Sequence, residues 1–189
     1  MTVAGVLLFP GAGSSSAHPS LVEVERALAP LPVARCDFPY RREGRRFPDR
    51  ADVLVHCVVE EARGFAHRLG CGTGSIVVGG RSMGGRMCSM AVAEGLDVAG
   101  LVCVAYPLHP PKQPDRLRTG HLPSVAVPSL FVSGTRDEFG SPDELRAATA
   151  LPAVRPELCL LDGVRHDLRG RDADVASVIA EWVGRLRVD

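Results

Sequence analysis

The sequence has no excess of charge of either sign and no long hydrophobic run. Its 189 residues include 22 arginines and lysines and 22 aspartates and glutamates, so the formal net charge is zero. A balanced charge does not favour nucleic acid as a partner, and we expect none. No apolar stretch approaches the roughly 20 residues that a membrane-spanning helix requires, so we expect a soluble protein without a membrane segment.

The sequence also lacks the marks of a targeting segment and of a metal or disulfide framework. Its first apolar run, residues 3–9, has no basic residues before it and ends at Pro10-Gly11, so we expect no signal peptide and a cytoplasmic location. The cysteines are dispersed and form no C-x-x-C pair, which favours buried thiols over zinc ligands or disulfides. Nothing calls for a metal or a cofactor. The cysteines are Cys36, Cys57, Cys71, Cys88, Cys103 and Cys159.

What the sequence does contain is an alternation of short apolar runs with helical patterns. The length suits one domain, residues 1–189, with a single core and no room for a large lid. The alternation predicts an α/β fold: a six-stranded, mainly parallel, doubly wound sheet with helices on both faces. In such folds the sites lie beyond the carboxyl ends of the strands. The predicted strands are 3–9, 33–38, 76–78, 99–105, 129–133 and 157–161.

Three helix starts carry recognisable capping signals. A serine followed by a glutamate three positions later, the pattern of a capping box, predicts helices that begin at Ser20 and at Ser141. Asp49 is the expected N-cap of a long amphipathic helix.

The most informative stretch is 75–85, where an apolar strand pattern runs directly into Gly80-Arg81-Ser82-Met83-Gly84. This is the G-x-S-x-G pattern of a nucleophile elbow, a tight strand-to-helix turn that exposes a serine hydroxyl. The pattern alone would occur by chance on the order of 0.1 times in such a chain. The rival stretch 13–17 is followed by a loop and a separate helix, so only Ser82 has a strand before it and a helix after it.

A serine nucleophile needs a general base and an acid that orients the base. His166 follows the last predicted strand and Asp137 follows the strand before it, in the order serine, acid, histidine. Glu138 and Asp162 are alternatives for the acid, and His109 and His121 share the same edge of the sheet but follow an earlier strand. His18 either flanks a helix or lines the pocket.

These motifs, taken together, resemble a minimal α/β-hydrolase over nearly the whole chain. More narrowly, they are similar to a dienelactone-hydrolase-like group whose eukaryotic relatives include testis-expressed hydrolase-like proteins and a subunit of the NSL histone-acetyltransferase complex. Dienelactone hydrolase itself has cysteine where this chain has serine. The stretches that carry the resemblance are residues 11–13, 38–40, 80–86, 106–110, 134–137 and 165–166.

The resemblance implies a role for each matching position. Ser82 would be the nucleophile, His166 the base and Asp137 the orienting acid. The oxyanion hole would use the backbone N–H of Met83 and one from the first loop, either Ala12 or Gly13.

Residues around the expected site are candidates for substrate binding. An arginine-rich loop that includes Arg41 and Arg42 is either a solvated segment or part of a positive rim that attracts a carboxylate or phosphate. Tyr106 and His109 follow the fourth predicted strand on the same edge. The rim would be completed by Arg45, Arg46, Lys112, Arg116 and Arg118.

The function that follows from these expectations is a serine hydrolase that cleaves a small ester or thioester through an acyl-enzyme intermediate. A non-catalytic binding or scaffold protein with the same fold is the alternative. The expected partner is a small acyl substrate, and the protein is expected to be a monomer or a small homo-oligomer.

Overall fold

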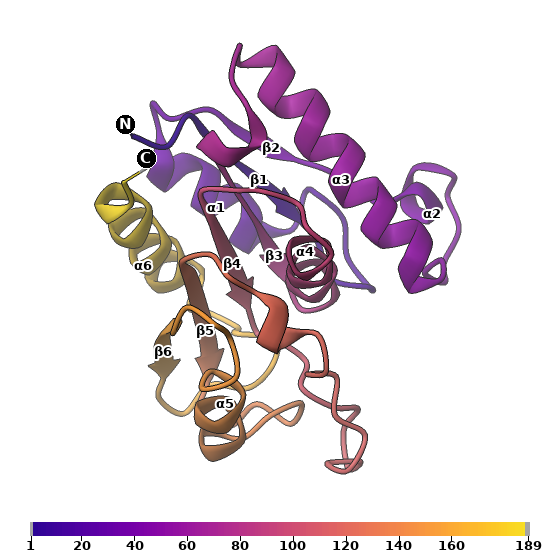
Figure 1. Ribbon diagram of the computed structural model, residues 1–189. Coiled ribbons are helices and arrows are strands. Elements are labelled where there is room, and N and C mark those ends of the chain that lie inside the picture. Colours follow the sequence, from indigo (N-terminus) through magenta and orange to yellow (C-terminus); the bar gives the residue numbers. More distant parts are fainter. Residues whose placement is uncertain (1, 188–189) are drawn as a thin grey trace.

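The computed structural model describes residues 2–187, in which six strands form one parallel sheet in the order β2-β1-β3-β4-β5-β6 (Figure 1). Residues 1, 188 and 189 of the predicted domain lie outside the described part. The chain runs outward from β1 to β2 and then crosses to β3 on the other side of β1, so the carboxyl ends of β1 and β3 form the topological switch point. The strands are β1 (Gly5–Phe9), β2 (Val33–Arg35), β3 (Ile76–Arg81), β4 (Gly100–Val104), β5 (Ser129–Gly134) and β6 (Glu157–Leu161).

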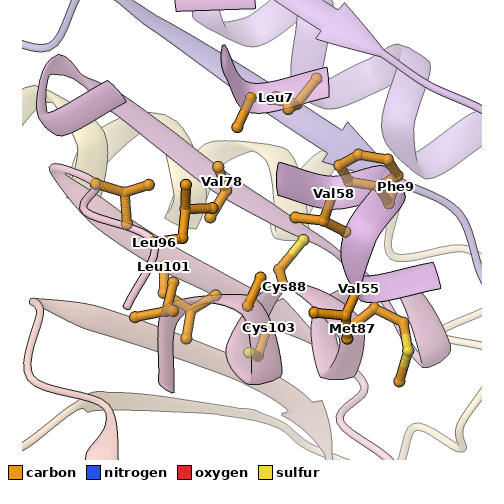
Figure 2. Close-up of a cluster of buried hydrophobic side chains, with 14 of the residues drawn as sticks. Leu7, Phe9, Val55, Val58, Val78, Met87, Cys88, Leu96, Leu101 and Cys103 are labelled. Atoms are coloured by element: carbon orange, nitrogen blue, oxygen red, sulfur yellow. The ribbon is translucent and has the colours of Figure 1, made fainter. Parts of the chain in front are cut away.

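Helices cover both faces of the sheet, as its buried strands require. Helices α1 and α6 pack on one face with Val6 and Leu8, and α3 and α4 pack on the other with Leu7 and Phe9 (Figure 2). Alternate residues of β1 therefore enter opposite cores. The helices are α1 (Pro19–Leu28), α2 (Pro39–Arg42), α3 (Ala51–Arg68), α4 (Met83–Ala93), α5 (Pro142–Ala148) and α6 (Asp172–Arg185), with short 3₁₀ turns η1 (Thr73–Ser75) and η2 (Leu122–Ser124).

The predicted doubly wound sheet with helices on both faces is confirmed, and its strands are all parallel. All six cysteines are free thiols. Within residues 2–187, no helix combines the length and the apolar character needed to cross a bilayer.

Two of the three predicted caps are wrong. Ser141 does form a capping box with Glu144. Helix α1, however, begins at Pro19, and its N-cap is His18, whose Nδ1 accepts from the Ser20 N–H at 3.2 Å. The N-cap of α3 is Arg50, and the carboxylate of Asp49 accepts from Arg45 at 2.6 Å.

Strand β3 and helix α4 approach β1 so closely that two glycines are required. A Cβ on either Gly80 or Gly84 would collide with the carbonyl oxygen of Phe9. The glycines of the serine motif therefore serve the packing of three elements as well as the turn between them.

The segment between β4 and η2 projects beyond the carboxyl edge of the sheet and is anchored to α4 by buried polar groups (Figure 1). The Ser89 hydroxyl donates to the Arg86 carbonyl at 2.8 Å, and the Tyr106 hydroxyl donates to the Arg118 carbonyl at 3.0 Å. The Nε2 atom of His121 lies 2.7 Å from Ser89 Oγ and 3.4 Å from the Tyr106 hydroxyl. Since each hydroxyl has given its one hydrogen to a carbonyl, we infer that His121 is protonated at Nε2 and donates to Ser89.

Burial, together with the nearby Arg86, lowers the pKa of His121 to about 4. The unfolded chain takes up a proton at the ordinary histidine pKa near 6.5, whereas the folded chain does not. The stability that comes from keeping this ring neutral is thus fully present above pH 6.5 and is lost as the pH falls toward 4.

We expect His121→Gln to flatten the pH dependence of stability, because it removes a group that titrates in the unfolded chain but not in the folded one. Urea unfolding at pH 7, 5.5 and 4.5 measures this, with His56→Gln on the exposed face of α3 as the control. If the free energy of unfolding changed equally with pH in the wild type and in His121→Gln, the expectation would be contradicted.

We expect Gly80→Ala and Gly84→Ala each to lower the free energy of unfolding by about 1–3 kcal/mol, the usual cost of overpacking. Gly72→Ala is the matched control, since nothing lies within 4 Å of its Cβ position. Urea unfolding of the three variants decides the matter: similar stabilities for all of them would mean that the close approach to Phe9 is unimportant.

Candidate active site

Ser82 lies at the junction of β3 and α4, with a backbone conformation that is unusual for a residue other than glycine. Its φ is 50° and its ψ is −114°. A positive φ at such a residue stores strain, which must be overcome by the surrounding structure. Ser82 N–H donates to the Val104 carbonyl at 2.7 Å, and its carbonyl accepts the first-turn bond from Arg86 N–H at 3.1 Å. The predicted strand, serine and helix are thus in place.

The hydroxyl of Ser82 meets a histidine and an aspartate that come from two later loops. Ser82 Oγ lies 2.9 Å from His166 Nε2, in the loop after β6. The other ring nitrogen, Nδ1, lies 3.0 Å and 2.9 Å from the two carboxylate oxygens of Asp137, in the loop after β5. The structure therefore brings together the three side chains that the sequence singled out.

The carboxylate of Asp137 is fully buried and held in a fixed orientation. It accepts hydrogen bonds from Ser133 Oγ at 3.1 Å and from Phe139 N–H at 2.8 Å, besides its contact with the imidazole. A carboxylate fixed in this way fixes the ring that it contacts.

The two alternative acids lie elsewhere. The carboxylate of Glu138 accepts from the backbone N–H of His166, at 3.5 Å. Asp162 accepts from Thr135 Oγ1 at 3.1 Å within a turn. Neither carboxylate is bonded to the imidazole.

The position of the His166 ring is further determined by two neighbours that the sequence did not indicate. The ring of Phe139 lies against it, with centroids 4.0 Å apart and an interplanar angle of 32°. Arg81, the residue before Ser82, donates from Nη2 to the His166 carbonyl at 3.0 Å. The guanidinium of Arg81 is largely buried, and burial lowers its pKa.

A cavity of about 730 Å³ opens over these side chains, at the switch point between β1 and β3. Ala12 and Gly13 of the first loop and Met83 of α4, the residues predicted to form the oxyanion hole, line it together with Ser82. His18 lines the cavity and also caps α1, so both expectations for it describe the structure. The cavity is lined by Gly11, Ala12, Gly13, Ser14, His18, Arg81, Ser82, Met83, Arg86, Pro107, Arg118, Phe139, His166 and Asp167.

The first loop is held in shape by residues that follow β2. The Tyr40 hydroxyl donates to the Ala12 carbonyl at 2.8 Å, and Asp37 accepts from Ser16 N–H at 2.7 Å and Ser16 Oγ at 3.0 Å. The Gly11 carbonyl accepts from Ser14 N–H at 3.1 Å. Both carbonyls are thus engaged, which fixes the directions of the Ala12 and Gly13 N–H groups on the same peptide planes.

The four predicted substrate-binding residues do not line the cavity. Arg41 and Arg42 lie on α2, and Arg42 forms an ion pair with Glu61 of α3 at 2.6 Å.

Tyr106 and His109 belong to the projecting segment, and both side chains are buried. His109 Nε2 lies 3.4 Å from Glu144 of α5. Of the wider positive rim, Arg118 reaches the cavity, where it joins Arg81 and Arg86.

No group of three or more histidine, cysteine, aspartate or glutamate side chains among residues 2–187 is arranged to hold a metal ion. The cavity presents a serine hydroxyl beside an imidazole and a buried carboxylate.

Comparisons with known proteins all point to the same family. The model of a family described as an alpha/beta hydrolase domain matches residues 2–182. A putative hydrolase of the alpha/beta superfamily from Xanthomonas campestris is 19% identical, with 97% of this chain and 99% of that chain covered and a TM-score of 0.74. Dienelactone hydrolase from Anabaena variabilis is 22% identical, with 98% and 88% covered and a TM-score of 0.75.

A lidless alpha/beta serine hydrolase from Xanthomonas campestris is 18% identical, with 100% and 86% covered and a TM-score of 0.74. These findings confirm the resemblance to small α/β-hydrolases that the sequence motifs indicated. The chain belongs to the alpha/beta hydrolase domain family.

Proposed function

We propose that the protein is a serine hydrolase that cleaves a small carboxylic ester or thioester through an acyl-enzyme intermediate on Ser82. The observation that carries this proposal is the line of contacts from Ser82 Oγ through His166 to the buried Asp137, at 2.9 Å and 2.9 Å, beneath an open cavity. A serine hydroxyl that only filled a turn would need neither the imidazole nor the carboxylate behind it.

In the first half of the reaction, Ser82 Oγ attacks the carbonyl carbon of the substrate while His166 Nε2 takes the hydroxyl proton. Asp137 accepts from Nδ1–H, which selects the tautomer with a free Nε2 and stabilises the imidazolium that forms. His166 then returns the proton to the leaving alcohol or thiol, and the acyl group stays on Ser82.

The negative charge that develops on the substrate oxygen needs donors that are already in place. Met83 is the first residue of α4, so its N–H has no partner within the helix and lies at the positive end of the helix dipole. The second donor is the N–H of Ala12 or of Gly13, in the loop that Tyr40 holds.

In the second half, His166 removes a proton from water, which attacks the acyl-enzyme and releases the acid. An acceptor other than water would make the same site an acyltransferase.

A fluorophosphonate probe should label the wild-type protein, and Ser82→Ala should abolish labelling because the probe reacts with an activated serine. Intact-protein mass spectrometry measures the adduct. Ser14→Ala, which removes another hydroxyl at the same cavity, is the matched control and should still be labelled. An unlabelled wild-type protein, or labelling that survives in Ser82→Ala, would instead favour a binding or scaffold protein with a hydrolase fold.

Asp137→Asn should lower kcat for a p-nitrophenyl ester by about 10³–10⁴-fold, because the amide favours the wrong imidazole tautomer. Glu138→Gln, next in the chain, should have little effect, since its carboxylate reaches only the backbone of His166. Steady-state kinetics measure both, and thermal unfolding checks that the variants are folded. A large decrease of kcat in Glu138→Gln, with no decrease in Asp137→Asn, would reverse the assignment of the acid.

A further inference from the structure

Two arginines that line the cavity have no acidic partner. Within residues 2–187, the side chains of Arg86, on α4, and Arg118, on the projecting segment, form no ion pair and no hydrogen bond. Other arginines do have such partners: Arg35 pairs with Glu25 and Arg42 with Glu61, each at 2.6 Å. At the cavity, no acid among the described residues is paired with Arg86 or Arg118.

The unpartnered guanidiniums are partly withdrawn from water, which makes the lack of a partner costly. Nε of Arg86 is buried and has no hydrogen-bond acceptor, and the same is true of Nε of Arg81, a residue whose exposed fraction is only 9%. Burial and the positive charges of Arg86 and Arg116 lower the pKa of Arg118. Buried donors without acceptors are destabilising, so a site that retains them gains most when a ligand supplies the acceptors.

The charge of the lining indicates what kind of ligand is missing. The lining contains Arg81, Arg86 and Arg118, but only one carboxylate, that of Asp167. The carboxylate of Asp137 lies just behind His166. With neutral histidines and Asp137 counted, the site keeps an excess of one positive charge, so it favours an anion. A phosphate monoester offers three acceptor oxygens to the guanidinium donors, one more than a carboxylate does.

The backbone carbonyls of both arginines are also engaged in hydrogen bonds. The carbonyl of Arg86 accepts from Ser89 and that of Arg118 from Tyr106, and His121 joins the two hydroxyls. This network connects α4 to the projecting segment, so the backbones that carry the two guanidiniums are fixed before any ligand arrives. Such preorganisation reduces the entropic cost of binding.

We propose that Arg86 and Arg118 form an anion subsite beside Ser82 and that the ester or thioester cleaved there carries a phosphate group. The subsite rests on the cavity geometry alone, whereas the identification of its occupant as part of a substrate rests on the proposed hydrolase function. Arg81 contributes charge but is a positioning residue, since its Nη2 holds the His166 loop.

The test is calorimetric binding at pH 8 of phenyl phosphate, benzoate and benzamide, which share a ring and differ in charge. Wild-type protein should bind phenyl phosphate at least about 10-fold more tightly than benzoate, because charge-assisted hydrogen bonds to guanidinium are strong. Arg86→Gln and Arg118→Gln should each weaken phenyl phosphate binding by about 10-fold or more and leave benzamide binding unchanged. Arg116→Gln, an exposed arginine of the same segment that does not line the cavity, should behave as the wild type.

Benzoate binding as tight as phenyl phosphate binding would overturn the phosphate assignment. Undetectable binding of phenyl phosphate would overturn the subsite itself. So would a loss of phenyl phosphate affinity in Arg116→Gln equal to that in Arg86→Gln and Arg118→Gln. Thermal unfolding checks that the variants are folded. If Arg86→Gln does not fold, phenyl phosphate binding by Arg118→Gln tests the subsite, because Arg118 is half-exposed.

Fluorophosphonate labelling of Ser82 separates this inference from the function on which it partly rests. Phenyl phosphate should slow labelling in the wild type but not in Arg86→Gln. A protein that is labelled but does not bind phenyl phosphate would remain a hydrolase without this subsite. A protein that binds phenyl phosphate but is not labelled would keep the subsite and lose the proposed function.

Discussion

The close approach of β1, β3 and α4 at Phe9 is the constraint on which the rest of the site depends. The Phe9 carbonyl leaves no space for a Cβ on Gly80 or Gly84. The turn between these glycines holds Ser82 at a φ of 50°, a conformation that persists only where packing on both sides enforces it. Two hydrophobic cores, one on each face of the sheet, supply that packing, and the strained serine is thereby raised above the carboxyl edge of the strands.

The order of the strands explains why the remaining groups gather at the same place. The switch point between β1 and β3 sets the first loop, with Ala12 and Gly13, next to the serine. The loops after β5 and β6 then deliver Asp137 and His166 to the same edge. Two of these loops are fixed by a partly buried hydrogen bond from another element: the first loop by Tyr40 to Ala12, and the loop after β6 by Arg81 to His166. The proposed mechanism needs groups that are positioned before the substrate binds, and this arrangement supplies them.

The parts of the site that the sequence could predict are those that follow directly from strand ends. Ser82, Asp137 and His166 each come a few residues after a strongly apolar run, so a parallel sheet places them on one edge whatever the details of the packing.

The contacts of Tyr40 and Arg81 could not be predicted, because they join residues 28 and 85 positions apart through tertiary packing. For the same reason the different surroundings of Arg42 and Arg118 could not be read from composition: Arg42 pairs with Glu61 on a neighbouring helix, and Arg118 lines the cavity. The cap of α1 was misassigned because a histidine, an uncommon capping residue, took the place expected for Ser20.

The central claim is that the strained turn presents Ser82 to an oxyanion hole made by α4 and the first loop. A crystal structure of the fluorophosphonate adduct measures this directly. The account predicts a phosphonyl oxygen about 2.7–3.1 Å from Met83 N and from the N atom of Ala12 or Gly13, with phosphorus bonded to Ser82 Oγ. An adduct on another residue, or a phosphonyl oxygen that points into solvent with no backbone donor near it, would contradict the account.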